Sequence, residues 1–262
     1  MTSKTEPRLL CYDLGEGVTA FSTTRHGGVS EANYASFNIN PYCGDSADHV
    51  ACNRQLLADR LGLPASHIVL PHQVHGIEHR AVAPELLDMS DAVRDKILDG
   101  VDMVTTSMTG VCIGVSTADC IPVLLYDPVA RATAAIHAGW RGTLQRICQR
   151  AVMAMQLHYG TTPDRLRAVV GPGISLANFE VGQEVYDQFV QAGFDLTETA
   201  EWHTKWHLDL PGINIRDLIG CGVAPEHIHH AGICTFDHAD DYFSARRLGI
   251  DSGRIYTGIL MR

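Results

Sequence analysis

The sequence predicts a mixed α/β fold, a layered α/β sandwich in which helices cover sheets that contain both parallel and antiparallel strands. Apolar runs of strand length alternate along the chain with segments of helical periodicity. The runs at 111–115, 121–126 and 132–136 follow one another too closely for crossover helices, so some neighbouring strands must be antiparallel. No segment has the composition of a linker, and residues 1–262 are expected to form a single domain.

The first half of the chain contains one clear helix between short strands. Residues 18–24 alternate like a strand and lead into the glycine pair 27–28. A helix is expected from Ser46, a typical N-cap residue, to the stop signal at 62–64, and a short strand at 67–70 follows. Residues 84–100 are polar and charged, which indicates a surface helix or loop without functional residues.

The second half continues the alternation after the strands at 111–115, 121–126 and 132–136. Apolar residues recur at steps of three and four from Gly142 to Gly160, which predicts one amphipathic helix. A strand at 166–170 and a helix within 179–193 follow. The C-terminal part predicts a helix at 213–219 and strands at 228–233 and 254–260.

Charge and composition exclude several classes of partner. The formal net charge of -10 argues against nucleic-acid binding, which requires a basic face. No apolar run approaches the roughly 18 residues of a membrane span, so no membrane partner is expected. The first 14 residues lack the apolar core of a signal peptide, and the eight cysteines form no C-x-x-C pair. These features predict a cytoplasmic protein with free thiols.

Three metal-binding side chains lie where predicted strands stop. His75 follows the strand at 67–70, Cys120 lies in the turn between two strands, and His137 ends the run at 132–136. Strand ends gather at one rim of an α/β sheet, where ligands tend to bind. Two imidazoles and one thiolate suffice to bind Zn²⁺, and three protein ligands with an open fourth position are typical of catalytic zinc.

Several segments of the chain resemble a known family in the same order along the sequence. They are STTRHGGVS (22–30), SFNIN (36–40), QVHG (73–76), STADCIPVLLYDP (116–128), AAIHAGWRGT (134–143), GPGI (171–174) with NFEVG (178–182), LDL (208–210) and YFSARR (242–247). Together they resemble the purine nucleoside phosphorylase family that is also labelled polyphenol oxidase or laccase-domain. The pair TADC and HAGWRGT is the most diagnostic part of this resemblance.

The resemblance implies a single catalytic domain that binds zinc through His75, Cys120 and His137. It implies phosphate-dependent cleavage of adenosine, inosine, guanosine and methylthioadenosine, together with hydrolytic deamination of adenosine. The partners are then small-molecule purine nucleosides and phosphate. For deamination, zinc activates water for attack on the purine carbon that bears the amine. Phosphorolysis needs a phosphate directed at the anomeric carbon of the ribose.

The sequence also offers candidates for phosphate binding and proton transfer. Gly139 and Gly142 allow close approach of an anion to the start of the predicted helix, and Arg141 adds a bidentate donor. Arg25, Arg246 and Arg247 are further candidates for the pocket. Asp119 is predicted to orient a ligand histidine or to carry a proton. Alternatively, it is a turn residue whose carboxylate accepts hydrogen bonds from backbone N–H groups. The predicted catalytic set is His75, Cys120, His137 and Asp119.

Two other histidine clusters carry weaker signals. The segment 227–238 holds His227, His229, His230, Cys234 and His238. Strand alternation places His229 and His230 on opposite faces, which disfavours a second metal site there. His203 and His207 have the four-residue spacing of a helical turn and share that interval with two tryptophans, so packing on a helix is the favoured interpretation.

Three alternative functions remain open at this stage. The laccase label suggests a copper oxidase of phenols, but the chain has a single H-x-H and no evident blue-copper set, so copper is less favoured than zinc. Cys120 with His137 or His75 as base would make a thiol hydrolase, possible substrates being cell-wall precursors. In a non-catalytic alternative, zinc only joins strand ends in a binding protein.

Overall fold

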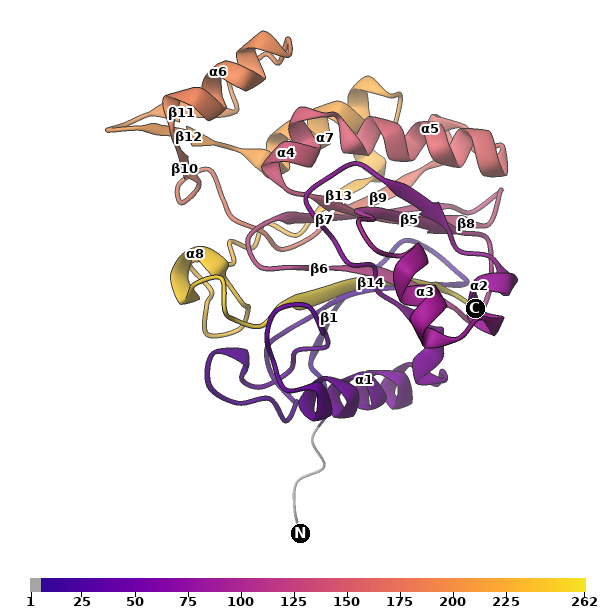
Figure 1. Cartoon of the computed structure of the whole chain (residues 1–262). Coiled ribbons are helices and arrows are strands. Elements are labelled where there is room, and N and C mark those ends of the chain that lie inside the picture. Colours follow the sequence, from indigo (N-terminus) through magenta and orange to yellow (C-terminus); the bar gives the residue numbers. More distant parts are fainter. Residues whose placement is uncertain (1–5) are drawn as a thin grey trace.

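Two stacked β-sheets form the centre of the molecule in this computed structural model, which describes residues 6–262 (Figure 1). The first five residues, which the predicted domain includes, lie outside the described part. The first sheet has five strands in the order β1-β2-β14-β6-β3. Their bounds are β1 (Leu9–Tyr12), β2 (Val18–Thr23), β14 (Ile255–Met261), β6 (Cys112–Thr117) and β3 (Ile68–Val69).

The second sheet has six strands in the order β13-β9-β7-β8-β5-β4. Their bounds are β13 (Ile228–His230), β9 (Arg167–Val170), β7 (Ile121–Asp127), β8 (Ala132–Ala138), β5 (Met103–Thr106) and β4 (His79–Ala81). Both sheets are mixed: β3 is parallel to β6, β4 to β5 and β13 to β9, while the other neighbours are antiparallel. The predicted mixed, layered fold is therefore confirmed.

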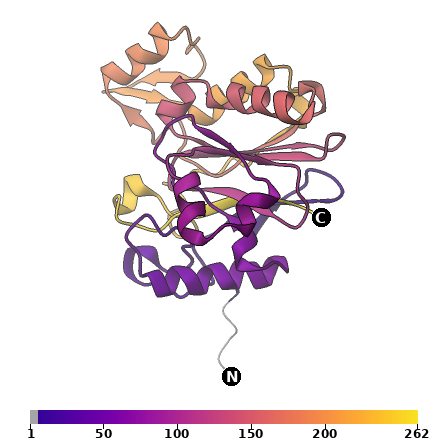
Figure 2. The ribbon, with the colours of Figure 1, turned by 45° about the vertical axis from the view of Figure 1, so that its right-hand side comes forward.

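Helices cover both outer faces of the stacked sheets, which gives four layers (Figures 1 and 2). Helix α1 (Ala47–Leu61) packs on the first sheet, and α5 (Ile147–Tyr159) and α7 (Leu210–Gly220) pack on the second. Shorter helices lie around this body: α2 (Pro84–Asp88), α3 (Asp91–Ile97), α4 (Trp140–Leu144) and α8 (Ala245–Leu248). Within residues 6–262, no helix combines the length and apolar character needed to cross a bilayer.

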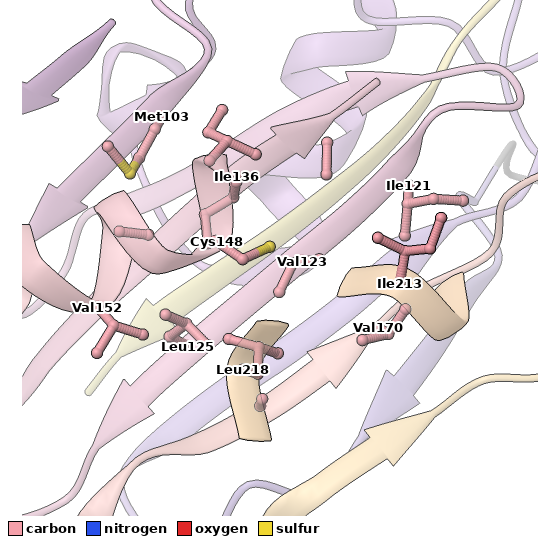
Figure 3. Close-up of a cluster of buried hydrophobic side chains, with 14 of the residues drawn as sticks. Met103, Ile121, Val123, Leu125, Ile136, Cys148, Val152, Val170, Ile213 and Leu218 are labelled. Atoms are coloured by element: carbon pink, nitrogen blue, oxygen red, sulfur yellow. The ribbon is translucent and has the colours of Figure 1, made fainter. Parts of the chain in front are cut away.

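Strand alternation divides the core into layers. On β7, Val123 and Leu125 face the helices, whereas Leu124 belongs to the cluster between the sheets. Figure 3 shows Val123, Leu125 and Ile136 of the second sheet packed against Cys148 of α5 and Leu218 of α7. Burying such a side chain contributes about 1.5–3 kcal/mol to the free energy of folding. The packed layers therefore fix the positions of the strand ends near the site.

The segment around His203 and His207 is a hairpin rather than the predicted helical turn. A small sheet of β10 (Glu180–Val181), β12 (Trp206–Leu208) and β11 (Ala200–Trp202) lies beside α6 (Gln183–Gln191) at one edge of the molecule (Figure 1). Trp202 pairs directly with Trp206 across the strands. A spacing of four residues fits both a helix turn and a hairpin with a three-residue connection, so spacing alone misled the prediction.

The single helix predicted from Gly142 to Gly160 is two helices in the structure, α4 and α5. Arg146 between them adopts φ 58°, in the left-handed region. Helix α4 therefore has only five residues and does not continue into the long amphipathic helix. The predicted strand at 228–233 is shorter than expected and ends at His230.

Candidate metal centre

His75, Cys120 and His137 lie together at one end of the two sheets. Their donor nitrogen and sulfur atoms all lie within 4.8 Å of one another. Ile121 at the start of β7 pairs with Ala138 at the end of β8, which brings the turn holding Cys120 beside His137. Strand β3 runs parallel to β6, so the loop that carries His75 leaves β3 at the same end where β6 turns into β7.

Gly139 makes room for this cluster. A Cβ atom at position 139 would lie 2.9 Å from Cδ2 of His75 and 3.1 Å from Sγ of Cys120. The glycine backbone has φ -70°, an ordinary value, so the requirement here is space rather than an unusual dihedral angle. In addition to the predicted close approach of an anion, the structure shows that Gly139 permits the close approach of His75 and Cys120.

Asp102 joins the two histidines, although its sequence context indicated no role. Its carboxylate is buried and lies 2.6 Å from Nδ1 of His137. The same carboxylate accepts hydrogen bonds from the backbone N–H groups of Val74, His75 and Gly76. An ionised carboxylate only accepts, so Nδ1 of His137 keeps its proton, and Nε2 is the nitrogen that would bind a metal after losing its own proton.

These bonds also stabilise an uncommon backbone conformation at a ligand. His75 has φ 63°, which is rare for a residue other than glycine. Three successive N–H groups directed at one carboxylate hold that turn in place. Although burial opposes ionisation of Asp102, the bonds from His137 and the loop amides keep its pKa below the usual range.

The electrostatics of the cluster favour the thiolate form of Cys120. Burial raises the pKa of a thiol, but the neighbouring charge and hydrogen bonds of His137 and His75 outweigh burial and lower the pKa of Cys120 to about 6. Burial likewise opposes the charged form of His137, yet Cys120 and Asp102 raise its pKa to about 9. A thiolate is the form in which cysteine binds a metal.

A side-chain pair fastens the His75 loop to β6. Gln73 accepts a hydrogen bond from the N–H of Ser116 at 2.8 Å and donates one to the carbonyl oxygen of the same residue at 2.9 Å. Asn40 then donates to Oγ of Ser116 at 2.6 Å. These contacts fix the distance between the loop and the strand that leads to Cys120.

The three donors border an open cavity of about 200 Å³. Its lining residues are Asn40, Tyr42, Cys43, His72, Gln73, His75, Ser116, Thr117, Ala118, Cys120, His137, Ala245, Ile250 and Arg254. Within residues 6–262 no other His, Cys, Asp or Glu joins the three-donor cluster. Three ligands beside an open cavity match the arrangement in which a catalytic metal keeps one position for reactants.

Asp119 lies next to Cys120, but its hydrogen bonds are not to His75 or His137. Its carboxylate accepts hydrogen bonds from Oγ1 of Thr235 at 2.7 Å and from the N–H of Arg246 at 2.6 Å. It therefore ties the start of α8 to the turn that holds Cys120, and Ala245 of α8 lines the cavity. The position expected for a carboxylate that orients a ligand histidine belongs to Asp102.

The predicted arginines lie outside the lining of the cavity. Arg25 donates to the carbonyl oxygens of Ala35 and Ala239. Arg141 is exposed, and its guanidinium stacks 4.2 Å from the ring centre of Trp140. Arg246 donates to the carbonyl oxygens of Asn178 and Glu180, and Arg247 to that of Phe236. The arginine that does line the cavity is Arg254, which was not among the predicted site residues.

The second histidine cluster does not assemble. Within residues 6–262, the group of His75, Cys120 and His137 is the one set of three or more such donors close enough to hold an ion. Cys234 instead accepts hydrogen bonds from Ser175 and Asn178. His229 and His230 follow each other on β13, as the alternation argument assumed.

Comparison with known proteins shows relatives that match nearly the whole chain. A family described as multi-copper polyphenol oxidoreductase laccase matches residues 19–262. A purine nucleoside phosphorylase of Bacteroides thetaiotaomicron is 44% identical over 247 residues, which cover 93% of this chain and 92% of that protein. A protein named adenosine deaminase RL5, from an unknown prokaryote, is 40% identical over 248 residues, with 93% and 94% covered.

The fold has close structural relatives as well. The crystal structure of Bacillus licheniformis hypothetical protein YfiH superposes with a TM-score of 0.90 at 27% sequence identity. The superposition covers 100% of this chain and 98% of that one. The likeness therefore extends over both sheets and their helices.

Proposed function

Because this chain belongs to the multi-copper polyphenol oxidoreductase laccase family, in which relatives carry enzyme names, we propose that it is a zinc-dependent purine nucleoside phosphorylase that also deaminates adenosine. Its proposed substrates are adenosine, inosine, guanosine and methylthioadenosine, with phosphate as the second reactant. The names of relatives with about 40% identity over nearly the whole chain support both activities. The observation that carries the proposal is the three-donor cluster beside an open cavity.

The residues of the cluster fit a zinc ion. Two imidazoles and one thiolate are a common donor set for zinc, and Asp102 completes the carboxylate–histidine pairing that accompanies such sites. His75, Cys120 and His137 would hold the ion. When bound, it would supply a Lewis acid that polarises reacting groups in the cavity.

The protein's own residues prepare this site before any substrate arrives. Asp102 fixes the tautomer of His137 and the turn at His75, so little reorganisation is required on binding. Gln73 and Ser116 hold one wall of the cavity, and Asp119 holds the α8 wall.

The donor set also bears on the copper alternative. Oxidation of phenols by several copper ions requires more than one group of ligands. Within the described residues 6–262, a single three-donor group occurs. This favours a mononuclear site, and thiolate with imidazole suits zinc.

Metal analysis and product chromatography test the proposal. The purified protein is expected to contain zinc, to convert adenosine and phosphate into adenine and ribose 1-phosphate, and to form inosine without phosphate. His137→Ala should lose both activities, whereas His26→Ala, whose ring pairs with Asp241 outside the cavity, should keep them. Metal-loaded wild-type protein that leaves adenosine unchanged under both conditions would overturn the assignment.

A further inference from the structure

His72 and Asp99 form a second histidine–carboxylate pair, on the wall of the same cavity. Nδ1 of His72 lies 2.6 Å from Oδ1 of Asp99. The backbones support the pair: the N–H of His72 donates to the carbonyl oxygen of Leu98, and the N–H of Gly100 donates to that of His72. Both hydrogen bonds measure 3.0 Å, so residue 99 is held directly opposite residue 72.

Ring stacking also restrains the side chain of His72. The imidazole stacks on Tyr42 with ring centres 4.2 Å apart and an angle of 28° between the planes. The N–H of Tyr42 donates to Oδ1 of Asn40 at 2.6 Å, which fixes the chain at this tyrosine. Tyr42, His72 and Asn40 all line the cavity that the metal cluster borders.

This pair has one nitrogen available for a ligand. Asp99 occupies Nδ1 of His72, and among residues 6–262 no hydrogen bond engages Nε2. The His72 side chain is 41% exposed, so it is open to a molecule in the cavity. Because Nδ1 is paired with Asp99, Nε2 is the nitrogen through which His72 can exchange a proton with a molecule in the cavity.

Resting on the proposed phosphorylase activity, we propose that His72 is the general acid that protonates the purine base as it leaves the ribose, and that Asp99 positions it. The metal cluster and His72 border the same cavity, so a nucleoside can contact both. The sequence indicated no function for residues 84–100. In this proposal one of them, Asp99, has a role in catalysis because it positions His72.

The bonds and protons of this step balance. A phosphate oxygen forms the new bond to C1′ of the ribose while the C1′–N9 bond breaks, and the electron pair of that bond passes into the purine. The imidazolium of His72 gives its Nε2 proton to a ring nitrogen of the departing base. The hydrogen phosphate loses its proton to the solvent as its oxygen bonds to C1′, the neutral imidazole takes up one proton from the solvent, and Nδ1–H stays hydrogen-bonded to Asp99.

Two substrates that differ in leaving group test this role. Inosine has no amine to lose, and its base leaves more readily when a ring nitrogen is protonated, whereas the base of 7-methylinosine already carries a positive charge and leaves without an acid. We expect His72→Gln to lower kcat on inosine with phosphate by about 100-fold or more, and kcat on 7-methylinosine by about tenfold or less. Asp99→Asn should follow the same pattern with a smaller loss on inosine.

A matched control exists in the chain. His26 pairs with Asp241 at 2.9 Å but does not line the cavity, so His26→Gln should leave kcat and KM on both substrates unchanged. Thermal unfolding and metal content of the His72 variant should match the wild type. Should that variant not fold, Asp99→Asn with the same two substrates decides.

The outcomes separate this proposal from the proposed function. Wild-type protein that cleaves neither nucleoside refutes the phosphorylase assignment itself. Wild-type activity combined with an equal loss on both substrates in the His72 variant shows that His72 acts by positioning, and unchanged inosine turnover shows that it has no role. Either result overturns the proposal.

Discussion

The carboxylate of Asp102 lies 2.6 Å from Nδ1 of His137 while it also binds the backbone N–H of His75 at 3.0 Å. One buried side chain therefore orients two candidate ligands, His137 on β8 and His75 in the loop that follows β3. It does so because Asp102 directly precedes β5, which lies between β4 and β8, and the N–H of His137 donates to the carbonyl oxygen of Asp102.

Replacing this carboxylate by an amide should weaken metal binding. In Asp102→Asn, the amide can donate to Nδ1 of His137, which moves the ring proton to Nε2 and removes the lone pair that a metal needs. We expect metal affinity and nucleoside turnover to fall by about 10- to 100-fold, measured by competition with a chromophoric chelator. Asp241→Asn, in the exposed pair with His26, is the control, and unchanged affinity in Asp102→Asn would contradict the role.

A methyl group at position 139 should disrupt the cluster. In Gly139→Ala, the new Cβ meets His75 and Cys120 at about 3 Å, so at least one ligand must shift. We expect metal affinity to fall by roughly tenfold or more, since ligand placement decides affinity. Gly220→Ala, where no atom lies within 4 Å of the added Cβ, should bind metal like the wild type. Equal metal content in the two variants would show that the cluster tolerates the methyl group.

Bound metal should protect Cys120 from alkylation. A metal ligand is unavailable as a nucleophile, so iodoacetamide should modify Cys120 roughly tenfold or more faster after chelation. Peptide mass spectrometry follows each cysteine separately, and exposed Cys52 on α1 provides an internal control whose rate should not change. If turnover rose as the metal was removed, Cys120 would instead act as the nucleophile of a thiol hydrolase.

His79 should make stability depend on pH. Burial, together with the nearby charges of His158 and Arg80, lowers the pKa of His79 to about 4 from 6.5. The unfolded chain therefore takes up a proton at higher pH than the folded protein, and the free energy of unfolding falls as the pH drops from 6.5 toward 4. His79→Gln removes this contribution, so urea unfolding at several pH values should show a flatter dependence. Parallel curves for the two proteins would contradict the assignment.

Local pattern was sufficient to predict the fold class and to single out the three donor residues that the fold brings together. Apolar runs showed which segments were strands, and His75, Cys120 and His137 each came where such a run stopped. The resemblance to a known family added their common function. Asp102 left only a weak signal, a single carboxylate between the apolar residues Val101 and Met103, and β5 itself was not recognised as a strand.

The arginines show the limit of such arguments. Arg141 follows the ligand His137 closely in sequence, yet its side chain is exposed and stacks on Trp140, while distant Arg254 lines the cavity. Proximity along the chain does not determine which way a side chain points once a short helix begins. The hairpin at 200–208 makes the same point, because its spacing also fits a helix.

By itself, the sequence determined which segments alternate and which side chains can bind a metal, since these properties depend on residue type and on neighbours a few positions away. Tertiary structure alone decided that Asp102 reaches His137, that Gly139 leaves room for two ligands, and that Asp99 stands opposite His72. The physical reason is that these contacts join segments whose proximity depends on strand order and register, and register follows from packing of the whole sheet.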